Sequence, residues 1–190
     1  MRALLLAVLL LVTGCVQAPP TPTNRIPIGP DLFLSLPDAA SLGRSIEVTQ
    51  LVTARYGERT IVFQTYLSAT PERFLMVSVD PLGRQALSVT WTQQTISVEA
   101  ADWLPRDIRP ENILADLVLL YWPKAVVADS IAASGGTVQE AAGSRAILSK
   151  GTPLATITYS DPAKPLAGKA FFQHKVWGYS LDIDSQETQP

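Results

Sequence analysis

Short apolar segments separated by turn residues fill positions 45–100, and this pattern constrains the fold more than any other feature of the chain. In residues 60–68, apolar side chains recur at every second position, which is the period of a strand. The tetrapeptide Asp80-Pro81-Leu82-Gly83 has proline and glycine where a tight turn needs them. Because short connections join antiparallel neighbours, we predict a meander with one apolar face, which another layer must cover. The predicted strands are residues 46–55, 60–68, 74–79, 84–92 and 95–100.

A helix is predicted for residues 110–122, shortly after the meander. Pro110 suits a first helical turn, and Glu111 favours the positive end of the helix. Apolar residues then recur at helical spacing, and others widen the stripe: Ile113, Leu114, Leu117, Val118, Leu119, Leu120, Tyr121 and Trp122. So broad an apolar surface indicates that this helix is buried on more than one side or faces an apolar ligand.

The C-terminal part of the chain returns to strands after a second, short helix at residues 124–133, which stops at Gly135-Gly136. The chain has 190 residues, a length that suits one domain with a substantial core. We therefore predict a single α+β domain over residues 31–184 and a polar, frayed tail at residues 185–190. The predicted C-terminal strands are residues 137–142, 145–150, 154–160, 169–175 and 178–184.

The N-terminus has the pattern of an export signal. Met1-Arg2 leads into an apolar run at residues 3–12, which is too short to cross a bilayer that needs about 20 helical residues. Val12-Thr13-Gly14-Cys15 resembles the lipobox of bacterial lipoproteins, in which the cysteine is acylated and becomes the first residue. We expect residues 1–14 to be removed and Cys15 to carry palmitate-type chains. The alternative is an ordinary signal peptide with a chance cysteine.

Residues 15–30 contain five prolines, a density that opposes both sheet and helix. They are predicted to form a tether, which could reach about 45 Å if extended as polyproline II. The residue after the lipobox cysteine is Val16 and not aspartate. By the sorting rule of enterobacterial lipoproteins, this predicts an anchor in the outer membrane, with the domain facing the periplasm.

Composition excludes several classes of function. The formal net charge is −2 and no Lys/Arg cluster occurs, which argues against nucleic-acid binding and leaves membrane attachment to the acyl chains on Cys15. The chain has a single cysteine and therefore no disulfide framework of its own.

No catalytic constellation is visible. The chain has one histidine, His174, in a late strand, and it lacks a Gly-x-Ser-x-Gly elbow, a phosphate loop and a zinc-ligand cluster. We expect His174 at the sheet surface. Asp182 and Asp184 share a strand face and are expected to be solvated, with weak binding of a hard cation as the alternative. The prediction is therefore no catalytic residues, no metal and no cofactor.

The lipobox, the Pro-rich tether, the meander and the helix that ends in Trp122-Pro123 together resemble the outer-membrane lipoprotein receptor LolB and its periplasmic relative LolA. A family of LolB-like lipoproteins associated with aryl polyene and similar lipid-like pathways is also similar. Two local matches carry the resemblance. Pro81-Leu82-Gly83 is similar to the LolB turn whose leucine protrudes and delivers lipoproteins into the membrane, and residues 109–123 look like the apolar helix of that family.

The resemblance implies an antiparallel β half-barrel whose concave apolar face, covered by helices, accommodates acyl chains. It also implies a membrane- or cargo-transfer loop at Pro81, Leu82 and Gly83. A plain hydrophobic core would show the same periodicity, so that alternative stays open. The residues expected to line the cavity are Phe63, Leu75, Val77, Leu87, Val89, Trp91, Leu114, Leu117, Leu120 and Tyr121.

The expected function is binding of an acyl chain or lipid-like cargo and its transfer or insertion at the outer membrane, by a monomer that receives cargo from a periplasmic carrier or pathway protein. Two alternatives remain. The first is a cofactor-free enzyme, since the violacein-pathway protein VioE uses the LolA-like fold, with Arg55 or Tyr66 as polar cavity residues. The second is a subunit of an envelope assembly that transports nothing.

Overall fold

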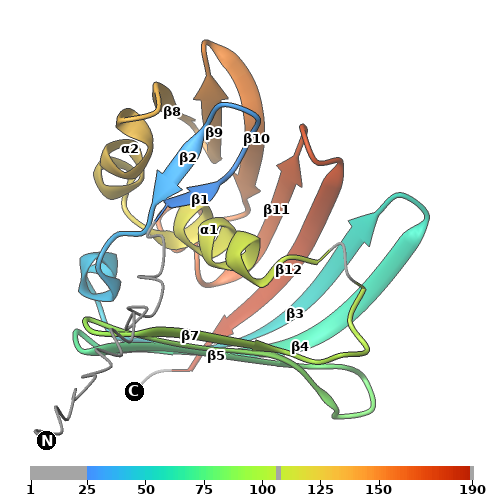
Figure 1. Cartoon of the computed structure of the whole chain (residues 1–190). Helices are drawn as coiled ribbons and strands as arrows, with labels where there is room; N and C mark the ends of the chain where they lie inside the picture. Colours follow the sequence, from blue (N-terminus) through green and yellow to red (C-terminus); the bar gives the residue numbers. More distant parts are fainter. Residues whose placement is uncertain (1–24, 106–107, 189–190) are drawn as a thin grey trace, which may run out of the picture.

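The computed structural model describes residues 25–105 and 108–188, and the predicted signal peptide, Cys15 and the first part of the tether lie outside the described residues. These described residues form a ten-stranded antiparallel sheet, a small two-stranded sheet, two α-helices and one 3-10 helix (Figure 1). The strands of the large sheet are β3 (Ile46–Tyr56), β4 (Arg59–Ala69), β5 (Arg73–Val79), β6 (Gln85–Thr92), β7 (Ile96–Ala100), β8 (Gly136–Ala141), β9 (Ser144–Ser149), β10 (Thr152–Tyr159), β11 (Gly168–His174) and β12 (Tyr179–Glu187).

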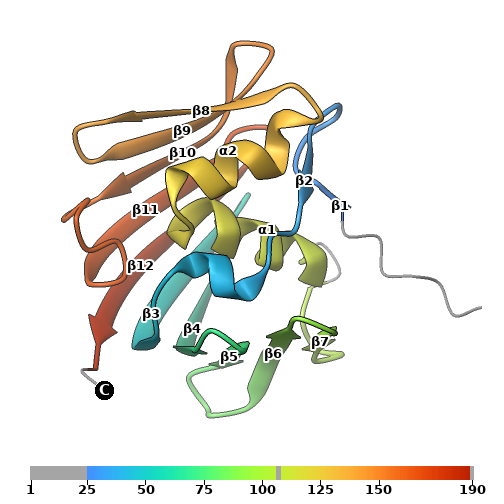
Figure 2. The ribbon, with the colours of Figure 1, turned by 90° about the vertical axis from the view of Figure 1, so that its left-hand side faces the viewer.

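The large sheet consists of two meanders joined through their ends. The first meander runs from β3 to β7 and the second from β8 to β12, and β3 pairs with β12 between Tyr56↔Tyr179 and Val48↔Glu187. In the described part of the chain the edge strands β7 and β8 do not pair, so the sheet is open. Figures 1 and 2 show it bent around the helices, an arrangement compatible with a half-barrel of the α+β class. The predicted succession of strands is confirmed.

The helices α1 (Pro110–Tyr121) and α2 (Lys124–Ala132) lie on the concave side of the sheet, close to the predicted ranges (Figure 2). Pro110 occupies the first turn of α1, where a missing N–H costs nothing. At the other end, the Arg145 guanidinium donates to the carbonyls of Leu119 (2.7 Å) and Trp122 (3.0 Å). The Tyr159 hydroxyl donates to the carbonyl of Leu120 at 2.7 Å. These side chains satisfy the carbonyls left free at a helix end and hold α1 against the second meander.

The predicted tether overlaps the folded domain. Residues 25–30 were expected to lie outside the domain, but β1 (Arg25–Pro27) pairs with β2 (Phe33–Ser35), and Ile26 and Ile28 are buried. Proline is tolerated here because the pair is only three residues long and Pro27 is its last residue. The folded domain therefore includes residues before Asp31.

The C-terminal boundary was also predicted too early. Strand β12 continues to Glu187, and Ser185, expected in a frayed tail, is 4% exposed. Its hydroxyl accepts a hydrogen bond from the Gln50 amide at 2.8 Å. Local polarity suggested fraying, whereas pairing with β3 continues to Val48↔Glu187 and orders the segment.

Two aromatic groups mark the packed interior. Trp91 stacks on Trp122 with ring centroids 5.3 Å apart, and Phe74 packs against Trp122 at 5.7 Å. The Trp122 indole N–H donates to the Ser41 hydroxyl at 2.9 Å in the 3-10 helix η1 (Ala39–Leu42). In the second meander, Phe172 lies on the concave face and is 0% exposed. The concave side of the sheet is not packed equally tightly throughout.

Candidate functional site

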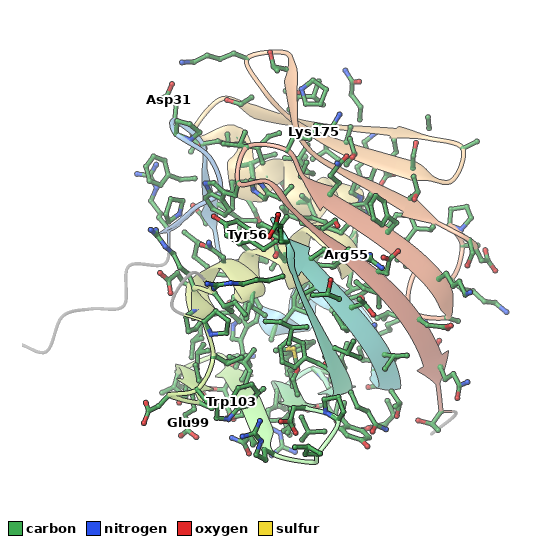
Figure 3. The ribbon with its side chains drawn as sticks, turned by 90° about the vertical axis from the view of Figure 1, so that its right-hand side faces the viewer. Asp31, Arg55, Tyr56, Glu99, Trp103 and Lys175 are labelled. Atoms are coloured by element: carbon green, nitrogen blue, oxygen red, sulfur yellow. The ribbon has the colours of Figure 1, made fainter. Side chains whose placement is uncertain are left out.

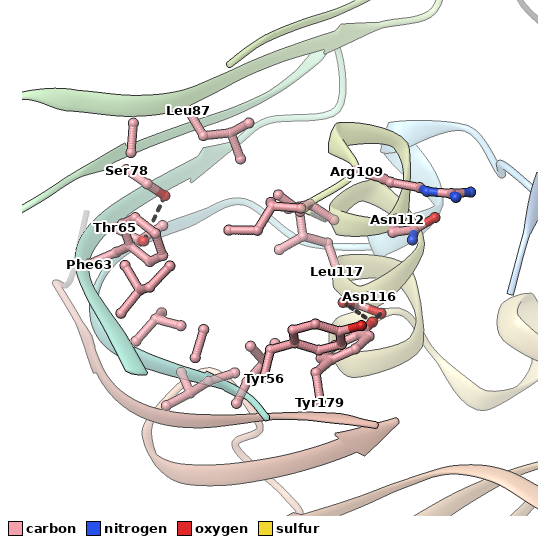
Figure 4. A pocket seen from close by; sticks show the side chains of 18 of the residues that line it. Tyr56, Phe63, Thr65, Ser78, Leu87, Arg109, Asn112, Asp116, Leu117 and Tyr179 are labelled. Carbon is pink, nitrogen blue, oxygen red and sulfur yellow. Dashed lines mark hydrogen bonds between the residues drawn. The ribbon is translucent and has the colours of Figure 1, made fainter. Parts of the chain in front are cut away.

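A cavity of about 550 Å³ lies between the concave face of the sheet and α1 (Figure 4). Its size falls within the range of about 300–1,000 Å³ that is usual for small-molecule sites. The lining side chains come from β3, β4, β5, β6, β12, α1, the loop before α1 and the β11–β12 turn, and most of them are apolar.

One stripe of α1 forms a wall of this cavity. Asn112, Asp116 and Leu120 recur every four residues, and Ile113 and Leu117 lie beside them. Residues three and four apart share one helix face, so the spacing accounts for their common orientation. The stripe also accounts for the broad apolar surface predicted for this helix, since other residues of α1 are buried against the core.

The opposite wall consists of side chains on β3 and β4 that point inward without being fully buried. Val52, Ala54, Ile61 and Phe63 all have intermediate exposure, although they lie on the concave face. Inward-pointing residues of a packed sheet would be covered by neighbours. Their partial exposure is the direct consequence of the empty volume in front of them.

The predicted cavity set divides into two groups. Phe63, Leu87, Leu117, Leu120 and Tyr121 line the cavity, as the sequence predicted. The remainder are absent from its lining, namely Leu75, Val77, Val89, Trp91 and Leu114.

Three of those absent residues belong to the packed core. Val89 is 1%, Trp91 2% and Leu114 3% exposed, and Trp91 is covered by the stacked ring of Trp122. The ring of Trp122 fills the space in front of Trp91, which periodicity could not predict. Leu114 lies outside the stripe of α1 that lines the cavity.

The prediction for Leu75 and Val77 was wrong about the face of the sheet. In β5 the buried residues are Phe74, Met76 and Ser78, so the odd-numbered residues point outward and Val77 is 37% exposed. A strand with apolar residues at consecutive positions carries no clear period-2 signal. Tyr66, expected as a polar cavity residue, likewise faces outward and is 46% exposed.

The inner part of the cavity has polar groups that satisfy one another. The Gln50 amide donates to the hydroxyls of Tyr121 and Ser185, each at 2.8 Å. The hydroxyls of Thr65 and Ser78 bond to each other at 2.8 Å. Burial raises the pKa of Tyr121 above its ordinary value, so its hydroxyl stays protonated. These groups leave an inner surface that behaves as an apolar one.

A different polar pair lies nearer the end of β3. The Tyr179 hydroxyl contacts both carboxylate oxygens of Asp116, at 2.6 and 2.8 Å. Burial raises the pKa of Asp116 to about 7, against the opposing effect of the hydrogen bond from Tyr179. Burial and the neighbouring carboxylate also raise the pKa of Tyr179 above its ordinary value. A buried carboxyl group that titrates near neutrality beside a cavity is a common feature of functional sites.

Behind Tyr179 lies His174, which was wrongly expected at the sheet surface. It is 0% exposed, stacks on Trp177 at 4.2 Å, and its Nε2 lies 3.1 Å from the Ile28 carbonyl oxygen. The Trp177 backbone N–H donates to Nδ1, so the Nε2–H donates to Ile28 in a neutral ring. Burial lowers the pKa of His174 to about 4. The histidine is therefore a structural support for the cavity wall.

The cavity reaches the surface at one rim of the sheet. Tyr56 at the end of β3 and Val176 in the β11–β12 turn both line it and are 49% and 48% exposed. Figure 3 shows Arg55 and Tyr56 at this end of β3. Arg55, predicted as a polar cavity residue, lines the cavity and forms an ion pair with Asp182.

The predicted transfer loop lies at the same rim, between β5 and β6. Leu82 is 81% exposed, and Gly83 adopts a positive φ of 78° that glycine tolerates best. The Asp80 carboxylate accepts hydrogen bonds from the backbone N–H groups of Leu82 and Arg84, each at 2.9 Å. Burial acts to raise the pKa of Asp80, but the hydrogen bonds from Arg84 and Leu82 lower it overall. Leu82 thus projects from a turn held by several hydrogen bonds.

Three residues of the site were not predicted from the sequence: Asn112, Asp116 and Tyr179. A carboxylate on an apolar helical stripe was a usable signal for Asp116, since an unpaired buried charge is costly. Its partner Tyr179 lies 63 positions away and could come only from the tertiary structure. Within residues 25–105 and 108–188, no group of three or more His, Cys, Asp or Glu residues could hold a metal ion.

The fold and the site define a class: an open, ten-stranded antiparallel sheet with a mainly apolar cavity between its concave face and a helix. The chain belongs to DUF3261, a family described as proteins of unknown function, whose sequence profile matches residues 47–187. That range runs from β3 to β12 and contains every residue that lines the cavity. No curated protein matches the chain in a sequence comparison. Neither helix of the described residues has the length and apolarity needed to cross a bilayer.

Proposed function

We propose that this protein is an outer-membrane lipoprotein, anchored through Cys15, that binds an acyl chain or lipid-like ligand in its half-barrel and transfers it at the membrane. The observation that carries the proposal is the cavity of about 550 Å³ with its mainly apolar walls. Each methylene moved from water into such a site contributes about 0.8 kcal/mol. A bound chain would cover the inward side chains of β3 and β4 that are partly exposed.

The position of Leu82 supports the transfer step. An exposed leucine on a rigid turn at the rim where the cavity opens can enter an acyl-chain environment while the domain stays folded. This agrees with the LolB-like role suggested by Pro81-Leu82-Gly83, with a periplasmic carrier or pathway protein as the source of the cargo.

The test is mass spectrometry of lipid retained by the purified full chain, compared with an Ala54→Phe variant. Ala54 lines the cavity with a small side chain, so phenylalanine would occupy part of the empty volume. We expect a non-covalent lipid on the wild type that added fatty acid displaces, and little or none on the variant. Equal retention by a variant with an unchanged unfolding transition, or an empty wild type, would refute the proposal. Acyl chains on Cys15 are covalent and are distinguished by mass.

A cofactor-free enzyme is the second candidate, and Asp116 favours it. A carboxyl group with a pKa of about 7 beside the Tyr179 hydroxyl could exchange a proton with a bound ligand. Here the retained ligand would be converted by the wild type but not by Asp116→Asn. Unaltered ligand recovered from the wild type after prolonged incubation would favour the carrier.

A further inference from the structure

The charged groups that line the cavity carry mostly one sign. Three arginines, Arg55, Arg59 and Arg109, lie among the lining residues, against a single carboxylate, Asp116. In the part of the chain that the structure describes, no lysine and no other acidic residue contributes to this lining. Because the whole chain has a formal net charge of −2, the local excess of positive charge does not follow from the composition.

Arg59 lies at the open end of the cavity. It pairs with Tyr56 across the β3–β4 turn, and Tyr56 is half-exposed at the rim. Residues directly opposite one another in an antiparallel pair share a face, so Arg59 lies on the concave side with Tyr56. Ile61 and Phe63 follow Arg59 at every second position of β4 and line the same cavity. Arg59 therefore extends the inner face of β4 to the rim.

Arg109 belongs to the opposite wall, at the N-terminal end of α1. Figure 4 shows its side chain extending away from Phe63 and Leu87. Arg109 is exposed, and an exposed side chain changes rotamer within nanoseconds, so its guanidinium can turn toward a head group at the opening. The positive end of the helix dipole lies here too, without a side-chain cap. Glu111, in the first turn of α1, is exposed and does not line the cavity.

The other two charges of the lining do not reverse this sign. Arg55 forms an ion pair with Asp182, so its charge is largely balanced. Both carboxylate oxygens of Asp116 contact the Tyr179 hydroxyl, at 2.8 and 2.6 Å. Burial raises the pKa of Asp116 to about 7, so this carboxyl group is mostly uncharged in mildly acidic solution. The two remaining arginines therefore set the charge at the rim.

We infer that the ligand is an amphiphile with an anionic head group, a carboxylate or a phosphate, which Arg59 and Arg109 bind at the rim while the apolar tail fills the cavity. The inference rests on the proposed function, because the apolar walls must hold the tail. A guanidinium can donate two parallel hydrogen bonds to the oxygens of a carboxylate or a phosphate. The head group stays next to water at the rim, so its charge is not buried.

The test compares decanoate with decanol, which have tails of equal length and differ in the charge of the head group. Their affinities for the purified full chain would be measured by titration calorimetry at about pH 6, where decanoate is ionised and Asp116 mostly is not. We expect Arg59→Gln and Arg109→Gln each to weaken decanoate binding about fivefold, and the double variant about tenfold or more. Decanol binding should change by less than about twofold. Added NaCl should weaken the binding of decanoate only.

Two further variants are the controls. Arg109→Lys keeps the positive charge and should keep most of the affinity for decanoate. Arg73→Gln removes the same charge from an exposed residue at the start of β5, beside the end of β4 that is remote from Arg59. It should bind decanoate as the wild type does.

The outcomes separate the two proposals. Unchanged decanoate binding by the double variant, an equal loss for decanol, or an equal loss in Arg73→Gln would overturn the head-group subsite and leave the apolar cavity as a binding site. Failure of both probes to bind the wild type would overturn the proposed function, and the subsite with it.

Discussion

The two meanders belong to one sheet, yet the inward-facing side chains near the rim of the first are less buried than those of β10 and β11 in the second. In the second meander, Ile157, Phe172 and His174 are 0% exposed. In the first, Ile61 and Phe63 point inward and remain half-exposed because they face the cavity. Ile157 and Phe172 are as apolar as Ile61 and Phe63, so composition does not explain the difference.

The elements that cover each meander explain this difference in burial. The helix α2 packs against β8 and β2, and the β1–β2 pair packs against α1, so several layers fill the concave side of the second meander. Near the rim of the first meander, the N-terminal half of α1 and the loop before it are the elements opposite β3 and β4. The cavity thus arises because other elements cover one part of the apolar concave face and leave another part uncovered.

The largest expected effect on stability is that of Phe172→Ala, in the tightly packed second meander. Removing a fully buried ring that packs on His174 and Tyr179 should lower the free energy of unfolding by about 3–5 kcal/mol. Urea denaturation monitored by circular dichroism measures the effect. A loss below about 1 kcal/mol would show that this half is not tightly packed.

Asp116→Asn probes the boundary between the halves through pH. The pKa of Asp116 is raised from 3.8 to about 7 by burial, so its contribution to stability is complete below the lower value and is lost as pH rises through the upper one. Asparagine keeps an acceptor for Tyr179 without the charge. We expect the variant to be more stable than wild type above neutral pH by about 2 kcal/mol, and similar to it in acid.

Denaturation across a pH series measures this difference. His174 acts in the opposite direction, since its lowered pKa of about 4 removes stability as pH falls below 6.5. It contributes to both proteins equally and cancels in the comparison. A stability difference that does not change with pH would contradict the ionisation of Asp116 near neutrality.

Phe63→Ala tests the packing of the part of the first meander that borders the cavity. Its ring borders empty volume, so truncation removes fewer contacts than at Phe172, and we expect a loss of about 1 kcal/mol or less. The same denaturation experiment applies, with titration of decanol to follow the wider cavity. Losses of equal size at Phe63 and Phe172 would mean that the two halves are equally packed.

The smallest effect on stability is expected for Leu82→Glu. Leu82 is 81% exposed and the turn is held by Asp80, so the free energy of unfolding should change by less than about 0.5 kcal/mol. Transfer of a bound fluorescent fatty acid to lipid vesicles should nevertheless be abolished if the rim delivers cargo. Leu82→Met is the matched control, and unchanged transfer by Leu82→Glu would remove this residue from the proposed role.

Local sequence patterns predicted the helices and strands, but they did not predict how deeply each side chain is buried. Alternation placed Ile61 and Phe63 on one side of β4, which is the inner side, and helical spacing placed Leu117 on the cavity side of α1. The same reasoning failed for Leu75 and Val77, where consecutive apolar residues hide the period. It also could not separate Trp91, covered by Trp122, from residues that face the cavity.

The sequence by itself determined the first meander, the strands of the C-terminal part, the two helices between them and the apolar side of most strands, because residue periods of 2 and 3.6 are local properties of the backbone. Only the tertiary structure decided which end of the concave face is filled and which is hollow. That depends on contacts between distant segments, such as Ile28 with His174 and Asp116 with Tyr179. Such contacts follow from how whole layers cover one another, and no local period encodes them.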